Sequence, residues 1–433
     1  MLLVRKELPV NRVLYGLFLQ LDKPNHVIKQ DRLDRQELRT TGALASIFFL
    51  RMLGLFMLLP VLALYADRIV GATPLLIGIA LGIYGLTQAG LQIPMGRWSD
   101  RIGRKPVIVF GLLIFSAGGI VAALSGHIFA LLLGRALQGA GAISGAVLAL
   151  ASDLTRPQHR TTVMALIGIS IGISFSAAFV LGPWLDSIFG LAGLFWISAA
   201  LGITALPILI FGVPNPAGSS IAAPQSAPRI FWPPHRDLIS LYVGVFCLHG
   251  ILAASFISIP ILLSQGIGLD SGQHYTVYIP VLLTSLVCVA PMIMLSRRPA
   301  LARPLYCVAI AFVILGELAL WLAPVEKLNI IFGLTAFFIG FNFLEAALPS
   351  MVSRAAPEAG RGDALGTYST AQFVGMFAGG LGGGALSSAL SYTGIFVSAA
   401  LIACGWLIYA ILVPVTATTA ANREGTDTES SLG

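Results

Sequence analysis

The feature that most constrains the fold is a short charged segment, residues 96–106, between two long apolar runs. Its sequence, GRWSDRIGRKP, places four basic residues, one aspartate and two glycines in eleven positions. A soluble core does not surround such a cluster with continuous hydrophobic sequence, whereas a membrane protein does, because the charges mark where the chain emerges between two spans. Glycine permits a tight turn there. The segment therefore predicts a loop between two membrane helices, on the cytoplasmic side.

The composition agrees with an integral membrane protein. Of the 433 residues, 57% are hydrophobic and only 10% are charged, whereas soluble domains are about 25% charged. Because a helical span needs about 20 apolar residues, we predict an all-α fold with about twelve spans. The predicted spans cover approximately residues 41–65, 74–96, 106–124, 128–151, 160–184, 191–213, 238–264, 274–296, 303–323, 329–353, 363–390 and 394–414.

The spans form two groups of six. Residues 214–237, between the sixth and seventh spans, contain six prolines, which is typical of an extended linker. We therefore predict two pseudo-symmetric six-helix bundles, at 41–213 and 238–415, joined by a cytoplasmic linker. A cytoplasmic segment (1–40) precedes the bundles, and a polar cytoplasmic tail (416–433) follows them.

Basic residues collect on one side of the predicted membrane. If the spans alternate in direction, most of the 26 Lys and Arg residues lie on one side, and the loops of the other side hold only Arg68 and Lys327. This asymmetry predicts that both termini are cytoplasmic. It also accounts for the net charge of +7 without nucleic acid as a partner.

Ionisable side chains within spans are costly and usually mark function. Four fall on the first, fourth, seventh and tenth spans: Arg51, Arg135, His249 and Glu345. Glu345 is the strongest candidate for a proton carrier, because burial favours a neutral carboxyl group and a nearby cation favours the charged form. A fixed ion pair or a neutral hydrogen-bonded acid is the alternative. Glu317 lies near the outer end of the ninth span, where we expect it at the membrane interface.

The chain carries no recognisable catalytic or metal-binding motif. It contains no H-E-x-x-H, Walker A or G-x-S-x-G sequence, and its four cysteines show no C-x-x-C spacing. We therefore expect a protein that is not an enzyme and that uses neither a metal nor a cofactor.

Two motifs resemble those of the major facilitator superfamily of transporters. The opening segment resembles the superfamily's loop signature, G-x-x-x-D-R-x-G-R-[KR]. The matching residues are Gly96, Asp100, Arg101, Gly103, Arg104 and Lys105. Arg135 begins the sequence RALQG, which resembles the R-x-x-Q-G signature of proton-coupled members and implies a role in proton coupling. The resemblance also implies a central cavity lined by the first, fourth, seventh and tenth spans, and transport by alternating access.

The same resemblance implies that the loop signature takes part in gating. Asp100 would face the start of the eleventh span, near residues 362–366, where the helix dipole favours an anion. Arg101 and Arg104 would hold neighbouring charges in this latch. Asp100→Asn would then favour the state open to the cytoplasm.

The antiporter signature of the fifth span is only partly present. Gly182 and Pro183 match its G-P-x-x-G-G ending, but the closing glycines are absent, and we expect a hinge or packing role for the pair. Segments such as 341–346 and 368–373 resemble the YajR-type branch of proton-coupled multidrug-efflux transporters. That branch carries a cytoplasmic domain after the last span, which we do not expect in this chain.

Aromatic and amide side chains within the spans predict a mostly apolar cavity that suits lipophilic small molecules. The candidates are Tyr84, Gln88, Phe175, Phe246, Phe341, Asn342, Tyr368 and Gln372. We predict a monomeric, multi-pass transporter of a bacterial inner membrane that exports lipophilic or cationic small molecules in exchange for protons, with lipid as its surroundings. The alternatives are a transporter of a metabolite or sugar without a drug-efflux role, and a non-transporting receptor or scaffold.

Overall fold

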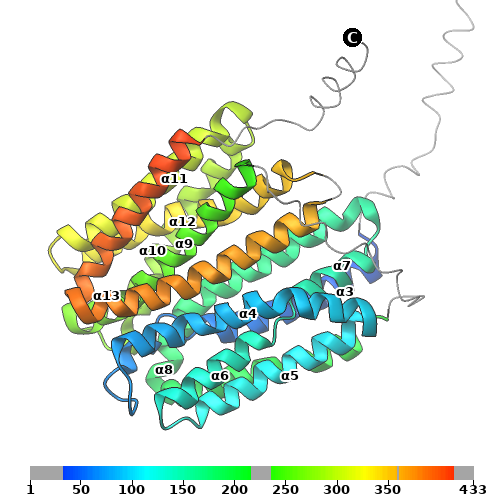
Figure 1. The fold of residues 1–433 in the computed structure, drawn as a ribbon, viewed down its shortest axis with the longest axis horizontal. Helices are drawn as coiled ribbons and strands as arrows, with labels where there is room; N and C mark the ends of the chain where they lie inside the picture. Colours follow the sequence, from blue (N-terminus) through cyan, green and yellow to red (C-terminus); the bar gives the residue numbers. More distant parts are fainter. Residues whose placement is uncertain (1–32, 216–235, 358–359, 414–433) are drawn as a thin grey trace, which may run out of the picture.

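The computed structural model describes residues 33–215, 236–357 and 360–413, and within these ranges the fold is built from helices (Figure 1). The helices of the first half are α3 (Arg35–Phe56), α4 (Pro74–Ile102), α5 (Arg104–Ala123), α6 (Ile128–Ala140), α7 (Ser144–Asp153) and α8 (Arg160–Gly212). Those of the second half are α9 (Arg236–Ile261), α10 (Tyr275–Ser296), α11 (Pro299–Leu322), α12 (Lys327–Ala355) and α13 (Arg361–Leu412). Short helical turns are η1 (Leu62–Tyr65), η2 (Pro157–His159), η3 (Leu262–Gly266) and η4 (Ser271–Gln273). Most of the predicted N-terminal segment, most of the linker and the predicted tail lie outside the described residues.

The structure confirms the all-α fold with about twelve spans. In the described ranges, eleven helical segments are long and apolar enough to cross a membrane. One of them, Pro157–Gly212, has 56 residues, about 84 Å at 1.5 Å per residue, far more than a bilayer core of about 30 Å. It is broken at Gly190, whose φ of 65° and ψ of −179° are not helical. Its two arms match the predicted fifth and sixth spans and bring the number of crossings to twelve.

The two halves meet along α4 and α13. The helix α13 contains two candidate spans, Arg361–Leu390 and Thr393–Leu412, and Figure 1 shows the first of them running beside α4. The contact is backbone against backbone: a Cβ atom on Gly82 would lie 2.7 Å from Cα of Phe377, and one on Gly384 would lie 2.7 Å from the carbonyl oxygen of Pro74. We call these helix surfaces, with their glycines at 78, 82, 380 and 384, the glycine seam. Small residues allow such close approach between membrane helices.

The glycine seam closes only one end of the molecule. It involves the beginning of α4, which we call the far end of the fold. At the other end, the basic end, α4 stops and α13 starts. Apart from chain neighbours and the backbone of the same helix turn, no atom of the described residues comes within 4 Å of a Cβ placed on Gly96, Gly362 or Gly366 there. The halves are therefore closed together at the far end and make no contact at these glycines of the basic end.

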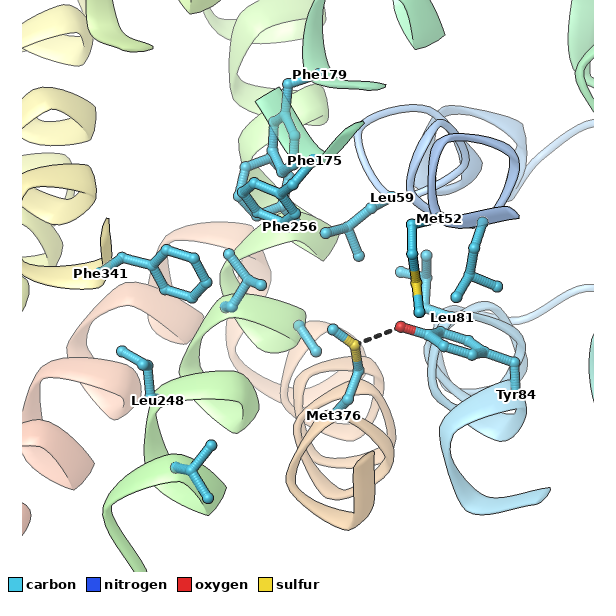
Figure 2. Packing of buried hydrophobic residues seen from close by; sticks show 14 of the residues in the cluster. Met52, Leu59, Leu81, Tyr84, Phe175, Phe179, Leu248, Phe256, Phe341 and Met376 are labelled. Atoms are coloured by element: carbon cyan, nitrogen blue, oxygen red, sulfur yellow. Dashed lines mark hydrogen bonds between the residues drawn. The ribbon is translucent and has the colours of Figure 1, made fainter. Parts of the chain in front are cut away.

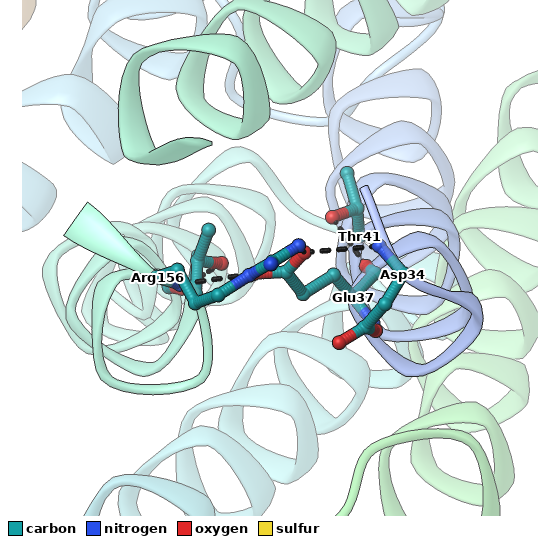
Figure 3. A network of polar contacts seen from close by, with 6 residues as sticks. Asp34, Glu37, Thr41 and Arg156 are labelled. Carbon is teal, nitrogen blue, oxygen red and sulfur yellow. Dashed lines mark hydrogen bonds and ion pairs between the residues drawn. The ribbon is translucent and has the colours of Figure 1, made fainter. Parts of the chain in front are cut away.

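At the basic end, polar contacts join elements of the first half. Asp34 caps α3, and Glu37 completes a capping box with it. Arg156 donates to Glu37 from Nε at 3.0 Å and from Nη2 at 2.7 Å (Figure 3). The hydrogen bond to Glu37 raises the pKa of Arg156. These bonds fix the start of α3 to the connection between α7 and α8.

The signature loop is a tight joint between α4 and α5. Gly103 ends α4 and precedes α5 with φ 98° and ψ 154°, a conformation that is essentially restricted to glycine. Arg104 pairs with Asp100 and, from Nε, with Oδ2 of Asp153 at 3.3 Å. Its Nη1 also donates to Oγ of Ser99 at 2.8 Å. The joint is thereby held to the end of α7.

The predicted latch to the start of the eleventh span is not formed in this conformation. Within the described ranges, Asp100 forms its ion pair with Arg104 of its own half, and no other element lies within 4 Å of a Cβ placed on Gly362 or Gly366. The latch therefore stays a prediction for a state in which the basic end is closed.

Gly103→Ala should destabilise the fold, because a Cβ atom is strained at its φ of 98°. Strain at such a position costs about 1–3 kcal/mol. Thermal unfolding of the purified protein in detergent measures the effect. Gly96→Ala is the matched control, since Gly96 is helical and has nothing within 4 Å of its Cβ position; equal losses in the two variants would contradict a conformational role for Gly103.

Candidate functional site

Aromatic side chains from both halves form one cluster where the halves face each other. Its members are Phe175 and Phe179 of α8, Phe256 of α9, and Phe338 and Phe341 of α12. The ring centroids of Phe175 and Phe341 are 5.5 Å apart, and those of Phe179 and Phe256 are 4.6 Å apart. Figure 2 shows Phe175, Phe179 and Phe256 close together, with the ring of Phe341 facing them. This aromatic cluster fills the space between the halves on the side of the far end.

Next to the aromatic cluster, toward the basic end, three polar side chains of the second half converge. Nε2 of His249 on α9 lies 3.4 Å from Oε2 of Glu345 on α12. Nε2 of Gln372 on α13 lies 2.8 Å from Nε2 of His249 and donates to Oε1 of Glu345 at 3.4 Å. The His249 ring also contacts Phe341, with centroids 5.7 Å apart. We call His249, Glu345 and Gln372 the polar triad.

The polar triad has one buried member and one accessible member. His249 is 4% exposed, whereas the Glu345 side chain is 40% exposed. Nδ1 of His249 lies 3.2 Å from the carbonyl oxygen of Val245, which assigns a hydrogen to Nδ1 and leaves Nε2 of the neutral ring to accept from Gln372. A proton added at Nε2 would be directed at the Glu345 carboxylate instead. The geometry can therefore hold a proton on either partner.

Two buried arginines occupy the first half. Nη1 of Arg135 donates to Oε1 of Gln138 at 2.8 Å, and its guanidinium carbon lies 4.6 Å from the ring centre of Tyr84. Nη2 of Arg51 donates to Oε1 of Gln88 at 2.9 Å. Among the described residues, neither arginine forms an ion pair with a carboxylate. Hydrogen bonds and aromatic rings therefore compensate part of the cost of burying these charges.

The four predicted ionisable residues do not form a single group. Arg51 and Arg135 belong to the first half, and the structure pairs Glu345 with His249 rather than with an arginine. One contact between the halves involves Tyr84, the residue whose ring lies beside Arg135. Its hydroxyl donates to Sδ of Met376 of the second half at 2.6 Å (Figure 2).

The other predicted cavity residues lie in different surroundings. Nδ2 of Asn342 donates to Oγ of Ser285 at 3.1 Å, away from Glu345. Tyr368 is 5% exposed and its hydroxyl has no hydrogen-bond partner among the described residues. Phe246 is separate from the aromatic cluster and lines a small apolar groove of about 130 Å³ between α9 and α13.

Gly182 and Pro183 lie within α8, where the helix touches the end of α3. A Cβ atom on Gly182 would lie 2.5 Å from the carbonyl oxygen of Met57. Close packing explains the glycine, while a hinge role for the pair stays a prediction.

The expectation for Glu317 was wrong. Its side chain is fully buried, not at the membrane interface, and Oγ of Ser255 on α9 donates to its Oε1 at 2.7 Å. An apolar span carries no signal for which of its faces meets another helix. The sequence could therefore predict the position of Glu317 along the helix axis, but not the side of the helix on which its side chain lies. Ser255 was missed for the same reason.

Comparisons with known proteins agree with this architecture. The sequence model of the Major Facilitator Superfamily matches residues 44–380. The inner membrane transport protein YajR of Escherichia coli is 42% identical over 379 residues, which cover 86% of this chain and 83% of YajR. The multidrug resistance protein MdtH of Aeromonas hydrophila is 28% identical over 358 residues, covering 79% of this chain and 86% of MdtH.

Solved structures show the same fold. A bacterial homologue of the human lysosomal transporter Spinster, in an inward-facing and occupied conformation, superposes with a TM-score of 0.72 at 14% identity, covering 90% of this chain and all of that chain. The family match extends over most of the spans, and the similarity to YajR extends over most of both proteins. The chain therefore belongs to the major facilitator superfamily of membrane transporters.

Proposed function

We propose that the chain exports lipophilic or cationic small molecules in exchange for protons, acting as a monomer in a bacterial inner membrane with its basic end in the cytoplasm. The observation that carries the proposal is the polar triad beside the aromatic cluster. The asymmetry of basic residues supports the orientation. The names of YajR, an inner membrane transport protein, and MdtH, a multidrug resistance protein, support the location and the substrate class.

The chemistry of exchange follows from one partly exposed carboxylate. The Glu345 side chain is 40% exposed, while its Oε2 is buried and lies 3.4 Å from Nε2 of His249. A bound lipophilic cation would neutralise the carboxylate as a proton does, so the two ligands compete for the same negative charge. The faces of aromatic rings such as Phe341 attract cations and bury apolar surface. Binding of substrate would therefore displace the proton.

Alternating access would give this competition its direction. The glycine seam closes the far end, so the polar triad releases its proton toward the basic end and receives substrate from the same side. Opening of the seam and closure of the basic end would then expose Glu345 to the other side, where the higher proton concentration displaces the substrate. In this scheme the signature loop contacts the second half only in that other state.

Proteoliposomes containing the purified protein and a pH-sensitive dye test the proposal, with ethidium as the probe. We expect ethidium to stimulate proton movement, and an imposed pH gradient to drive ethidium uphill. Nigericin, which collapses the gradient, should stop the uphill movement. Ethidium flux that is unchanged by nigericin would favour a facilitator and contradict exchange, and the absence of flux for a panel of metabolites, sugars and lipophilic cations would favour a receptor or scaffold.

A further inference from the structure

Glu317 is a buried acid that the exchange scheme does not use. It lies on α11, five residues before the end of that helix at Leu322, on the side of the far end. The side chain is 0% exposed. Oγ of Ser255 donates to Oε1 at 2.7 Å, while Oε2 is buried and has no hydrogen-bond partner among the described residues.

Among the residues that the structure describes, Glu317 has no ion-pair partner. In this part of the chain, Arg104 contacts Asp100 and Asp153, Arg156 contacts Glu37, and His249 contacts Glu345; Glu317 takes part in none of these pairs. Its contact from α9 is Ser255, and α12 presents backbone to α11 at this level, at the preceding Gly316. A carboxylate that is buried without a counter-ion is far more costly than a neutral carboxyl group.

Glu317 is separate from the polar triad. A Cβ atom on Gly316 would lie 2.6 Å from the backbone nitrogen of Phe337, so Glu317 is level with Phe337 on α12. Glu345 is eight residues further along that helix, about 12 Å at 1.5 Å per residue. Phe338 and Phe341 of the aromatic cluster lie between the two levels. The two acids are therefore at different depths, and the side chain of Glu345 is partly exposed whereas that of Glu317 is fully buried.

We propose that Glu317 is a second proton-binding site, and that it carries a proton while the glycine seam is closed. The proton resides on Oε2, and Oε1 accepts the hydrogen bond from Ser255. Because the side chain is fully buried on the side of the far end, the proton can leave only when the packing of α11 against α9, α12 and α13 loosens. The binding of this proton does not depend on the transported molecule; only a role in exchange would rest on the proposed function.

Infrared spectroscopy of the full-length protein in detergent at neutral pH tests the proposal, because a protonated carboxyl group has a C=O stretch distinct from that of a carboxylate. We expect a protonated-carboxyl band that Glu317→Gln removes and that Glu345→Gln leaves in place. Ser255→Ala should move the same band to higher wavenumber, because the carbonyl oxygen loses its hydrogen bond. The band should be the same in sodium and potassium chloride.

If the protonated-carboxyl band of the wild type is still present, unchanged, in the spectrum of Glu317→Gln, the proposal is overturned. A band that disappears in sodium chloride would also overturn it, since the site would then bind a metal cation. If Glu317→Gln does not fold, Ser255→Ala decides, and an unshifted band overturns the assignment. Failure of ethidium–proton exchange with the band intact would contradict the proposed function alone, so the two failures are distinguishable.

Discussion

Glu345→Gln is expected to reduce ethidium-stimulated proton movement to the level of empty liposomes. Glutamine keeps the size of the side chain and can still bond Gln372, but it cannot bind and release a proton. His249 is nearly buried, and its Nε2 lies 3.4 Å from Oε2 of Glu345. In the variant, the imidazole therefore faces an amide that cannot receive its proton. Exchange should stop, while downhill ethidium movement without proton coupling should persist if the cavity still binds the probe.

The matched control is Glu326→Gln, on an exposed glutamate that precedes the same helix. This substitution removes the same charge, but Glu326 lies at the start of α12, at the far end of the fold and away from the triad. The variant should therefore retain wild-type exchange. Normal proton coupling in Glu345→Gln would exclude Glu345 as the carrier. Loss of coupling in both variants would show that the effect is not specific to the triad.

Gly380→Ala is expected to shift the protein away from the conformation described above. A Cβ atom on Gly380 would lie 2.5 Å from the carbonyl oxygen of Gly78 and 3.1 Å from the backbone nitrogen of Gly82. Neither backbone can withdraw without separating α4 from α13, so the added methyl group forces the glycine seam apart. Overpacking of this kind costs about 1–3 kcal/mol, or about a 5- to 150-fold change in the ratio of the two states.

Distances between spin labels measure this shift. Labels at Arg97 and Asp363, placed in a background without the four native cysteines, report on the basic end, and we expect the shorter distance to gain population in Gly380→Ala. Gly382→Ala is the control, because Gly382 lies on the same helix with nothing within 4 Å of its Cβ position. Identical distance distributions in the two variants would argue against the seam as the element that closes the far end.

The positions of the spans could be predicted from the sequence, because each is set by a local property. Runs of apolar residues of membrane length fix the helices, and charges or glycine fix the breaks. The signature loop ends one helix and starts the next at Gly103, and the predicted gap between residues 184 and 191 contains Gly190, the point where the long helix breaks.

The polar triad could not be predicted as a group, because its members come from three helices and lie 27 to 123 residues apart. The sequence indicated each residue separately and did not identify the cation that would lie beside Glu345. Which side of a span meets another helix depends on rotation about the helix axis, and a span that is apolar all round leaves that rotation undetermined. The same undetermined rotation explains why the expectation for Glu317 was wrong.

The glycine seam has an entropic consequence for the transport cycle. An interface of interlocking side chains must immobilise rotatable bonds each time it closes, at up to about 1.5–2 kcal/mol for a long side chain. In the seam, backbone meets backbone at Gly78, Gly82, Gly380 and Gly384, and glycine has no rotamers to lose. When the helices separate, their carbonyl and amide groups stay bonded within each helix, so water can enter without freeing any of them. The far end can therefore close and open repeatedly with little conformational penalty in either direction.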